Sequence, residues 1–537
     1  MRVALVVSII CALIVLITSE DRQCQARNVG IPGRSIVCVC NAVYCDSITR
    51  ENPAPGTYVV YTSSYAGQRF EKSVGNIEVD PTRTEDDNVR PENDEDENEF
   101  EDTSLIRVSY RIFTNTRFQF IEGFGGSITD AASINWRKLS RAAQTNLIES
   151  YFGPEGIEYN LIRIPIAGCD FSTHPYTYNE YPWHDAELTN YTLSSEDYFY
   201  RLPMLATSLR TAREEVKITA SAWSPPIWMK TNERITGFGQ LRPQYYQAYA
   251  DYHLRFLEEL EKMNIKVWAI TTTNEPINGI VPLAPFNSLG WLPSQLARWV
   301  ANNLGPTIRN SRFNQTKIFA VDDQRYLLHY YVLGMEREDP KSIEYIDGIA
   351  VHYYGNFVPA SILSNLQNRY PNKMLLSTEA CEGPMPWDEH KVELGSWDRA
   401  RNYVRYILQD LNNFVVGWID WNLCLDPEGG PNWANNFVDA PILVYGDQDE
   451  FIKQPMFYAM GHFSKFIPRG SRRIQVSRRS LATVENLAVI KPNGHIVVVL
   501  QNANENERIV HLRISATRFI ELTMEARSVK TIEINPN

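Results

Sequence analysis

The spacing of hydrophobic and polar positions changes character twice along the chain. Residues 51–80 have the pattern of short strands, for example TYVVYT at 57–62, and residues 105–120 show the same alternation between the two kinds of side chain, as strands with one buried face do. Between residue 121 and about residue 416, short β-rich runs alternate with longer helical stretches such as 243–263 and 292–304. After residue 468 the alternation returns between polar turns, in the runs 473–477, 482–490, 495–500, 509–514 and 528–534.

The central region predicts a parallel α/β fold. It contains eight β-rich runs, and eight is the number of strands that closes a (β/α)8 (TIM) barrel. The runs are residues 122–127, 160–166, 217–221, 267–272, 317–321, 348–352, 374–378 and 415–418. Because β-rich segments lie on both sides of the barrel, we expect them to form one flanking β-sandwich domain that contains both chain ends.

The first residues have the pattern of a secretory signal peptide. One arginine precedes a fifteen-residue apolar run, residues 3–17, which is shorter than the roughly 20 residues that span a bilayer. An uncleaved membrane anchor is the alternative. The predicted domains are therefore a signal peptide (1–20), a small cysteine-rich motif (21–50), the sandwich (51–117 with 468–537) and the barrel (118–467).

Four cysteines within residues 24–45 predict a disulfide-bonded motif, since secretion exposes them to an oxidising compartment. Three pairings are possible. A bond between Cys38 and Cys40 would close too tight a loop, so we favour Cys24–Cys38 with Cys40–Cys45. A metal site is the alternative, although no histidine lies nearby. Three further cysteines are left over, and they cannot all pair with one another: Cys169, Cys381 and Cys424.

Charge and sequons fit a secreted protein that does not bind nucleic acid. The net charge is −12, but residues 85–102 hold eleven acidic residues and one arginine, which leaves −2 for the rest. We expect that run to be a disordered acidic insertion. No basic stripe supports a nucleic-acid partner. Asn190 and Asn314 begin the sequons NYT and NQT and are candidate glycosylation sites.

Polar and aromatic residues end the predicted barrel strands, where TIM-barrel active sites lie. They are Asp130, Asp170, Trp223, Asn274, Glu275, Asp322, Asp323, Gln324, His352, Tyr354, Glu379, Trp421 and Asn422. A single residue of this kind is often a structural cap, but so many at one rim indicate a site.

Two carboxylates at this rim suit glycoside hydrolysis. Glu275 follows the fourth predicted strand in TTTNEP, and Glu379 follows the seventh in LLSTEAC. Hydrolysis of a glycoside needs one acid to protonate the leaving oxygen and one carboxylate to attack the anomeric carbon. Glu275 is therefore the candidate acid/base and Glu379 the candidate nucleophile of a retaining glycosidase. Two unrelated surface glutamates are the alternative.

Neighbouring residues have expected supporting roles. Arg163 points inward from the second strand, where it can donate to Glu379 or simply bridge strands in the barrel core. Asn274 can bond the 2-hydroxyl of the sugar. Residues that suit recognition of a terminal sugar, by hydrogen bonds or by stacking an indole on the ring, are Asp130, Trp223, Trp421 and Asn436.

Other hydrolytic chemistries lack their motifs. The chain has no Gly-x-Ser-x-Gly elbow for a serine hydrolase. Its nine histidines include no His-x-x-x-His spacing, so we expect no metal and no other cofactor.

These motifs resemble the glucosylceramidases of glycoside hydrolase family 30. The matching stretches extend from the cysteine motif to the C-terminal module and include GFGGSITDAA, YNLIRIPIAGCDFS, STEAC and PEGGPNWANNFVDAPI. The resemblance implies a barrel with a β-sandwich, and retaining hydrolysis of glucosylceramide in lysosomes. It implies that Gln324, His352 and Tyr354 shape the mouth of the site. It also implies two partners, an anionic lipid membrane surface and a saposin-type activator.

The sequence departs from the family at four places: the acidic run, a missing sequon after the cysteine cluster (Asn41-Ala-Val lacks the hydroxyl residue), Cys424, and the loop of residues 278–291 after the acid/base. The differing loop leaves the preferred aglycone open. Two alternatives remain: another β-glycosidase activity of the family, or a non-catalytic glycolipid-binding paralogue.

Overall fold

Eight parallel strands close into the predicted barrel in a computed structural model that describes residues 21–84, 106–281, 285–477 and 484–537. All eight predicted barrel strands are confirmed, and the fifth and eighth run a few residues further than expected. The strands are β7 (Gly123–Ser127), β8 (Leu161–Ile166), β9 (Lys217–Ala222), β10 (Val267–Thr271), β11 (Lys317–Gln324), β12 (Gly348–His352), β13 (Met374–Glu379) and β14 (Val415–Asn422).

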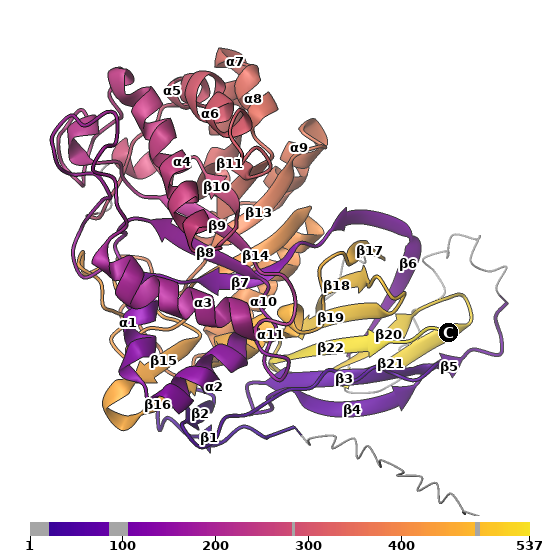
Figure 1. Cartoon of the computed structure of the whole chain (residues 1–537). Helices are drawn as coiled ribbons and strands as arrows, with labels where there is room; N and C mark the ends of the chain where they lie inside the picture. Colours follow the sequence, from indigo (N-terminus) through magenta and orange to yellow (C-terminus); the bar gives the residue numbers. More distant parts are fainter. Residues whose placement is uncertain (1–20, 85–105, 282–284, 478–483) are drawn as a thin grey trace, which may run out of the picture.

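Helices surround the barrel on its outer side (Figure 1). Both predicted helical stretches, 243–263 and 292–304, contain helix. The helices are α1 (Asp130–Lys138), α2 (Arg141–Phe152), α3 (Leu202–Thr211), α4 (Tyr246–Lys262), α5 (Pro293–Trp299), α6 (Gly305–Arg309), α7 (Leu328–Glu338), α8 (Lys341–Tyr345), α9 (Ser361–Arg369), α10 (Trp397–Asn412) and α11 (Pro455–Ser464).

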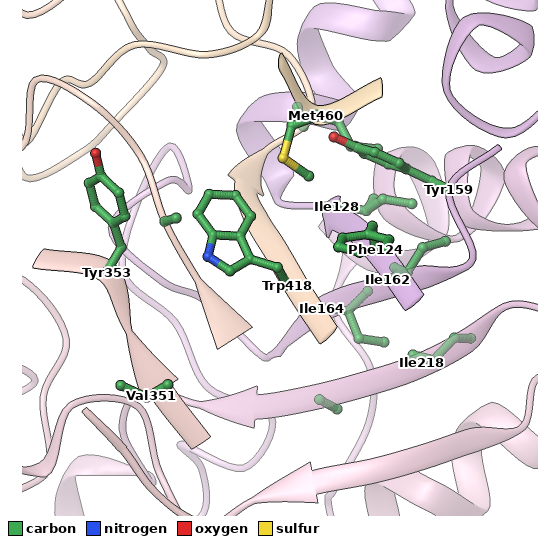
Figure 2. Packing of buried hydrophobic residues seen from close by; sticks show 14 of the residues in the cluster. Phe124, Ile128, Tyr159, Ile162, Ile164, Ile218, Val351, Tyr353, Trp418 and Met460 are labelled. Atoms are coloured by element: carbon green, nitrogen blue, oxygen red, sulfur yellow. The ribbon is translucent and has the colours of Figure 1, made fainter. Parts of the chain in front are cut away.

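Side chains of strand β8 alternate between the barrel interior and its outer face. Leu161 belongs to a small buried cluster contributed by several strands of the barrel, whereas Ile162 and Ile164 belong to the large core around them. Figure 2 shows Ile162 close to Phe124 of β7 and, further along this core, Met460 of α11. The alternation places Arg163 on the same face as Leu161, inside the barrel and toward its carboxyl end.

The first barrel strand, GFGGS, needs its glycines for space. A Cβ atom added at Gly125 would lie 1.8 Å from the carbonyl oxygen of Leu161 on the neighbouring strand β8. Only a residue without a side chain permits that approach.

The sandwich is a ten-stranded sheet in the order β4-β3-β22-β19-β18-β17-β6-β20-β21-β5. The runs expected there are strands, and one strand, β21, has no counterpart in the prediction. The strands are β3 (Thr57–Ser64), β4 (Glu71–Asn76), β5 (Glu78–Val79), β6 (Ile106–Phe120), β17 (Arg472–Val476), β18 (Val484–Ile490), β19 (Ile496–Asn502), β20 (Arg508–Arg513), β21 (Arg518–Met524) and β22 (Ser528–Ile534).

Strand β6 joins the two layers of this sheet. Its first part, residues 106–111, pairs with β20, and its later part pairs with β17. One buried cluster contains Val60 of β3 together with Leu512 of β20, so the sheet folds over on itself around a shared core. Strands from both chain ends lie side by side in it, because β3 pairs with β22 (Figure 1).

Both favoured disulfides are present in the N-terminal motif, Cys24–Cys38 and Cys40–Cys45. The left-over cysteines, Cys169, Cys381 and Cys424, are unpaired and buried. The motif's sheet has the order β1-β2-β16-β15, so it includes two strands from the chain's later half. Its strands are β1 (Ala26–Arg27), β2 (Val37–Asn41), β15 (Ile442–Tyr445) and β16 (Glu450–Lys453).

Several expectations concern the outside of the molecule. Asn190 and Asn314 are both exposed, as glycosylation would require. The predicted signal peptide and the acidic run 85–102 lie outside the described residues. Among the residues that the structure describes, no helix is both long enough and apolar enough to cross a bilayer.

Candidate active site

Glu275 and Glu379 face each other at the carboxyl end of the barrel. Glu379 is the last residue of β13, and Glu275 lies four residues after the end of β10. One carboxylate oxygen of each lies within 4.8 Å of the other and of a ring nitrogen of His352. Both side chains are largely buried. The two carboxylates are therefore close enough to act on one substrate bond.

Glu275 occupies a left-handed backbone conformation, with φ of 42°, at the start of the helical turn Pro276–Gly279. This conformation is uncommon for a residue with a side chain and is found where the surrounding structure enforces it. The carboxylate of Asp323 accepts hydrogen bonds from the backbone N–H of Ile277 (3.1 Å) and of Gln324 (2.7 Å). Asp323 thus ties the turn that carries Glu275 to the end of β11.

The oxygens of Glu275 accept hydrogen bonds from two amide side chains. Gln324 Nε2 donates to Oε1 (2.7 Å), and Asn278 Nδ2 donates to Oε2 (2.6 Å). These bonds fix the plane of the carboxyl group. Asn278 was not among the residues expected from the sequence.

Glu379 is held by one cation and one phenol. Arg163 Nη1 donates to Oε2 (2.5 Å), and the hydroxyl of Tyr354 donates to Oε1 (2.8 Å). Burial raises the pKa of Glu379, and the positive charges of His352 and Arg163 oppose that rise. Donors to both oxygens orient the carboxylate and stabilise its charge.

The Arg163 guanidinium contacts the candidate nucleophile and also side chains of several other strands. Besides Glu379, its Nη2 donates to Asn274 Oδ1 (2.8 Å) and to Asp322 Oδ2 (2.9 Å), and its Nε donates to Ser221 Oγ (3.2 Å). The guanidinium therefore bridges several strands and also supports the candidate nucleophile.

His352 carries a proton on each ring nitrogen. Its Nδ1 lies 2.9 Å from Glu275 Oε1 and its Nε2 lies 3.0 Å from Asp322 Oδ1. A protonated imidazole donates from both nitrogens, and Oε1 of Glu275 can accept whether or not its Oε2 carries a proton. Burial alone would lower the pKa of His352, but the negative charges of Glu379 and Asp322 raise it to about 10. A cation therefore lies between the two glutamates.

Asp322 is the buried anion that balances these two cations. It contacts Arg163 and His352, and accepts hydrogen bonds from the hydroxyls of Thr271 (2.8 Å) and Thr378 (2.6 Å). These charges and donors outweigh its burial and hold its pKa well below the usual range. The sequence placed Asp322 at the rim but did not indicate this role, because its partners, which include Ser221 (3.0 Å), come from five other strands.

Two tryptophans form the wall beside Arg163. The rings of Trp223 and Trp421 are stacked, with centroids 5.2 Å apart. The Arg163 guanidinium lies 4.9 Å from the first ring centroid and 5.2 Å from the second. The two predicted tryptophans thus lie together beside Arg163, the cation that donates to Glu379.

Asp130 begins helix α1 and is almost fully buried. Its Oδ2 accepts hydrogen bonds from the hydroxyls of Ser172 (2.6 Å) and Tyr176 (2.9 Å), and its Oδ1 lies 3.1 Å from Arg201 Nε. Burial raises its pKa despite these partners. The supporting residues come from the long segment after β8, and no spacing in the sequence links them to Asp130.

Asn436 lies in the segment after β14, and its side-chain Nδ2 donates to Asp170 Oδ2 (3.0 Å). Burial raises the pKa of Asp170 to about 7, and the charge of Glu379 adds to that rise. Asn436 is thus connected to the pocket through Asp170. Within the part of the chain that the structure describes, neither Asn436 nor Asp130 forms a hydrogen bond with Glu275 or Glu379.

Two groups among the described residues have the chemistry of metal ligands. One, Cys40 with Cys45 and Asp46, is occupied by the disulfide. The other is Glu275, His352 and Glu379. A doubly protonated imidazole has no lone pair to give a metal, and the Arg163 guanidinium adds positive charge, so this set does not suit a cation. Catalysis without a metal stays a prediction.

Comparison with known proteins adds family relationships to this geometry. Residues 121–467 match the glycosyl hydrolase family 30 TIM-barrel domain, and residues 470–532 match that family's β-sandwich domain. Lysosomal acid glucosylceramidase of Mus musculus is 39% identical over 504 residues, 93% of each chain. Putative glucosylceramidase 3 of Caenorhabditis elegans is 37% identical over 95% of this chain and 94% of its own. The crystal structure of SrfJ from Salmonella typhimurium superposes with a TM-score of 0.78 at 26% identity, covering 90% of this chain and all of that one.

Proposed function

The chain belongs to glycosyl hydrolase family 30, and from that premise we propose that it is a retaining β-glucosidase that hydrolyses glucosylceramide to glucose and ceramide. The observation that carries the proposal is the pair of buried glutamates, Glu275 and Glu379, with carboxylate oxygens within 4.8 Å of each other. Retaining glycosidases place their carboxyl groups about 5 Å apart, whereas inverting enzymes leave room for a water molecule between them. The glucosylceramidase names of the mouse and nematode relatives support the substrate.

The proposed reaction is a double displacement. Glu379 attacks the anomeric carbon while Glu275 gives its proton to the glycosidic oxygen, so that ceramide leaves and a covalent glucosyl–enzyme forms. Glu275, now ionised, takes a proton from water. The resulting hydroxide equivalent attacks the same carbon and releases glucose and the free Glu379 carboxylate.

The surrounding charges support these opposite roles. Glu379 must stay ionised to attack, and Arg163 and Tyr354 donate to its two oxygens. Asn274 has its Oδ1 turned toward Arg163, which can only donate. Its NH2 group therefore points away from the arginine, where it can donate to the sugar 2-hydroxyl, a contact that strengthens in the transition state.

The remaining pocket residues suit one glucose ring. An indole covers the apolar face of a sugar, and carboxylates and amides bind its hydroxyls. We assign these roles to Trp223, Trp421, Asp130 and Asn436, and assign Gln324, His352 and Tyr354 to the mouth of the site.

Exposed apolar side chains near the mouth suit a lipid aglycone. They follow the carboxyl ends of three successive strands, with Tyr326 after β11, Phe357 after β12 and Trp387 after β13. The last two are 76% and 78% exposed, and the rings of Tyr326 and Phe357 are 5.9 Å apart. Aromatic rings favour the membrane interface. These rings support a membrane surface as a partner, and from the family resemblance alone we add that its lipid is anionic and that a saposin-type activator assists.

We place the enzyme in the lysosome, reached through the secretory pathway. Two disulfides fit passage through an oxidising compartment, and Asn190 and Asn314 lie on the surface, where glycans are added. The lysosomal location named for the mouse relative supports the destination.

The test is glucose release from glucosylceramide in anionic-lipid micelles at mildly acidic pH, with wild type beside Glu379→Gln. We expect turnover by the wild type only, with both proteins giving the same circular dichroism. A panel of nitrophenyl glycosides separates this activity from other β-glycosidase activities. Sugar binding without turnover of any glycoside would contradict the proposal and favour a glycolipid-binding protein.

A further inference from the structure

The segment after β14 is fastened to the end of β8 by a group of hydrogen bonds, which we call the β8–β14 clamp. Trp433 donates its backbone N–H to the carbonyl oxygens of Asp170 (3.1 Å) and Ser172 (3.0 Å), and its indole Nε1 to that of Cys169 (2.9 Å). Asn432 and Asn436 both donate Nδ2 to Asp170 Oδ2, at 3.2 and 3.0 Å. The Asp170 carboxyl group thus accepts a hydrogen bond from each of the two amide side chains.

Asp170 decides which way the amide of Asn436 faces. An asparagine amide has a donor side and an acceptor side, and it flips readily when neither side is engaged. Because Asp170 Oδ2 accepts, it holds Nδ2 of Asn436, and Oδ1 must face the opposite direction. Asn432 cannot replace Asp170 in this role, since its own Oδ1 already accepts from the backbone N–H of Asn436 (3.0 Å) and of Ala434 (2.9 Å).

Asp170 belongs to the catalytic pocket and not merely to the loop. It is 4% exposed, and the charge of Glu379 acts on it. Its neighbour Cys169 packs in one buried cluster with Trp223 and Trp421. A change at Asp170 therefore reaches the residues that we assign to glucose binding.

We propose that Asp170 is a positioning residue of the sugar site: it turns the acceptor oxygen of Asn436 toward a glucose hydroxyl. The proposal rests on the proposed function and adds a determinant of sugar specificity to it. The role requires only an acceptor oxygen at Oδ2. Burial raises the pKa of Asp170 to about 7, so the group is largely neutral in mildly acidic solution. A neutral carboxyl still has an acceptor oxygen, and the role therefore persists there.

The test compares three variants on an aryl β-glucoside. Loss of one hydrogen bond to a neutral hydroxyl costs about 1–2 kcal/mol, so Asp170→Ala is expected to raise KM by about 5- to 30-fold and to change kcat much less. Asp170→Asn presents an amide oxygen in the same place and should recover most of the loss. Asp426→Ala is the matched control, because Asp426 also supports the segment after β14, through the N–H groups of Glu428 (3.2 Å) and Gly430 (2.7 Å).

A double-mutant cycle isolates the step through Asn436. If Asp170 acts by orienting this amide, Asp170→Ala combined with Asn436→Ala should raise KM no more than Asn436→Ala alone. Additive effects would overturn the proposal, as would an unchanged KM in Asp170→Ala or an equal rise in Asp426→Ala. Calorimetric binding of a glucose-configured iminosugar, 1-deoxynojirimycin, repeats the comparison without turnover. If the protein hydrolyses no glucoside but Asp170→Ala still binds the iminosugar more weakly, the positioning role stands and only the proposed function is refuted.

Discussion

The protonated His352 makes a quantitative prediction about stability and pH. Its pKa is about 10 in the folded protein, compared with 6.5 for the unperturbed side chain. A group whose pKa is raised by folding stabilises the protein fully below its unfolded pKa, and this stabilisation is lost as the pH rises toward the folded pKa. A difference of this size corresponds to about 5 kcal/mol, at about 1.4 kcal/mol for each unit.

The perturbation is His352→Gln, which keeps a polar side chain but removes the titrating charge. We expect the wild type to exceed the variant in unfolding free energy near pH 6.5, and the gap to shrink by about 1.4 kcal/mol for each pH unit up to pH 9. Urea denaturation of both proteins at matched pH values measures the gap. Other groups that titrate in this range, such as Asp170 and Glu382, are common to both proteins. A gap that stays constant between pH 6.5 and 9 would refute the double protonation of His352.

The remaining predictions concern single residues of the site. Tyr354→Phe removes a charge-assisted hydrogen bond from Glu379, so kcat should fall about 10- to 100-fold with little change in KM; an unchanged kcat would contradict this support. Glu275→Ala should still form the glucosyl–enzyme from an activated aryl glucoside, because that leaving group needs no acid, but hydrolysis should be slow because water lacks its base. Azide needs no base, so it should accelerate turnover and give glucosyl azide; absence of the adduct from a folded variant would count against the acid/base role. Phe357→Ala with Trp387→Ala should reduce hydrolysis of glucosylceramide in vesicles but not of a water-soluble glucoside, whereas Val74→Ser, an exposed change on edge strand β4, should affect neither. Equal losses on both substrates would argue against membrane contact.

The barrel could be predicted from the sequence because each strand carries a local signal. Runs such as LIRIPI and GIAVH are mostly apolar and bounded by turns, and such signals depend on neighbouring residues alone. Strands β11 and β14 exceed the predicted ends because their last residues are polar yet buried. Asp322 and Asp323 read as the start of a loop, but the barrel encloses them and supplies their partners.

Contacts between distant segments could not be predicted in the same way. Strands β15 and β16 complete the sheet of the N-terminal motif from about 400 residues further along the chain. Strand β21 alternates only weakly between buried and exposed positions, which explains why it was missed. The supports of the site, such as Arg201 beside Asp130 and Asp170 beside Asn436, depend on tertiary packing that no spacing encodes.

The central claim is that Glu379 forms a covalent bond to glucose. An activated 2-deoxy-2-fluoro-β-glucoside tests it most directly, because fluorine slows both steps while a good leaving group still lets the first proceed. We predict stoichiometric loss of activity and a fluoroglucosyl group on Glu379, located by fragmenting the tryptic peptide of residues 374–391. A label on another carboxylate, or equal labelling of Glu379→Gln, would contradict the account.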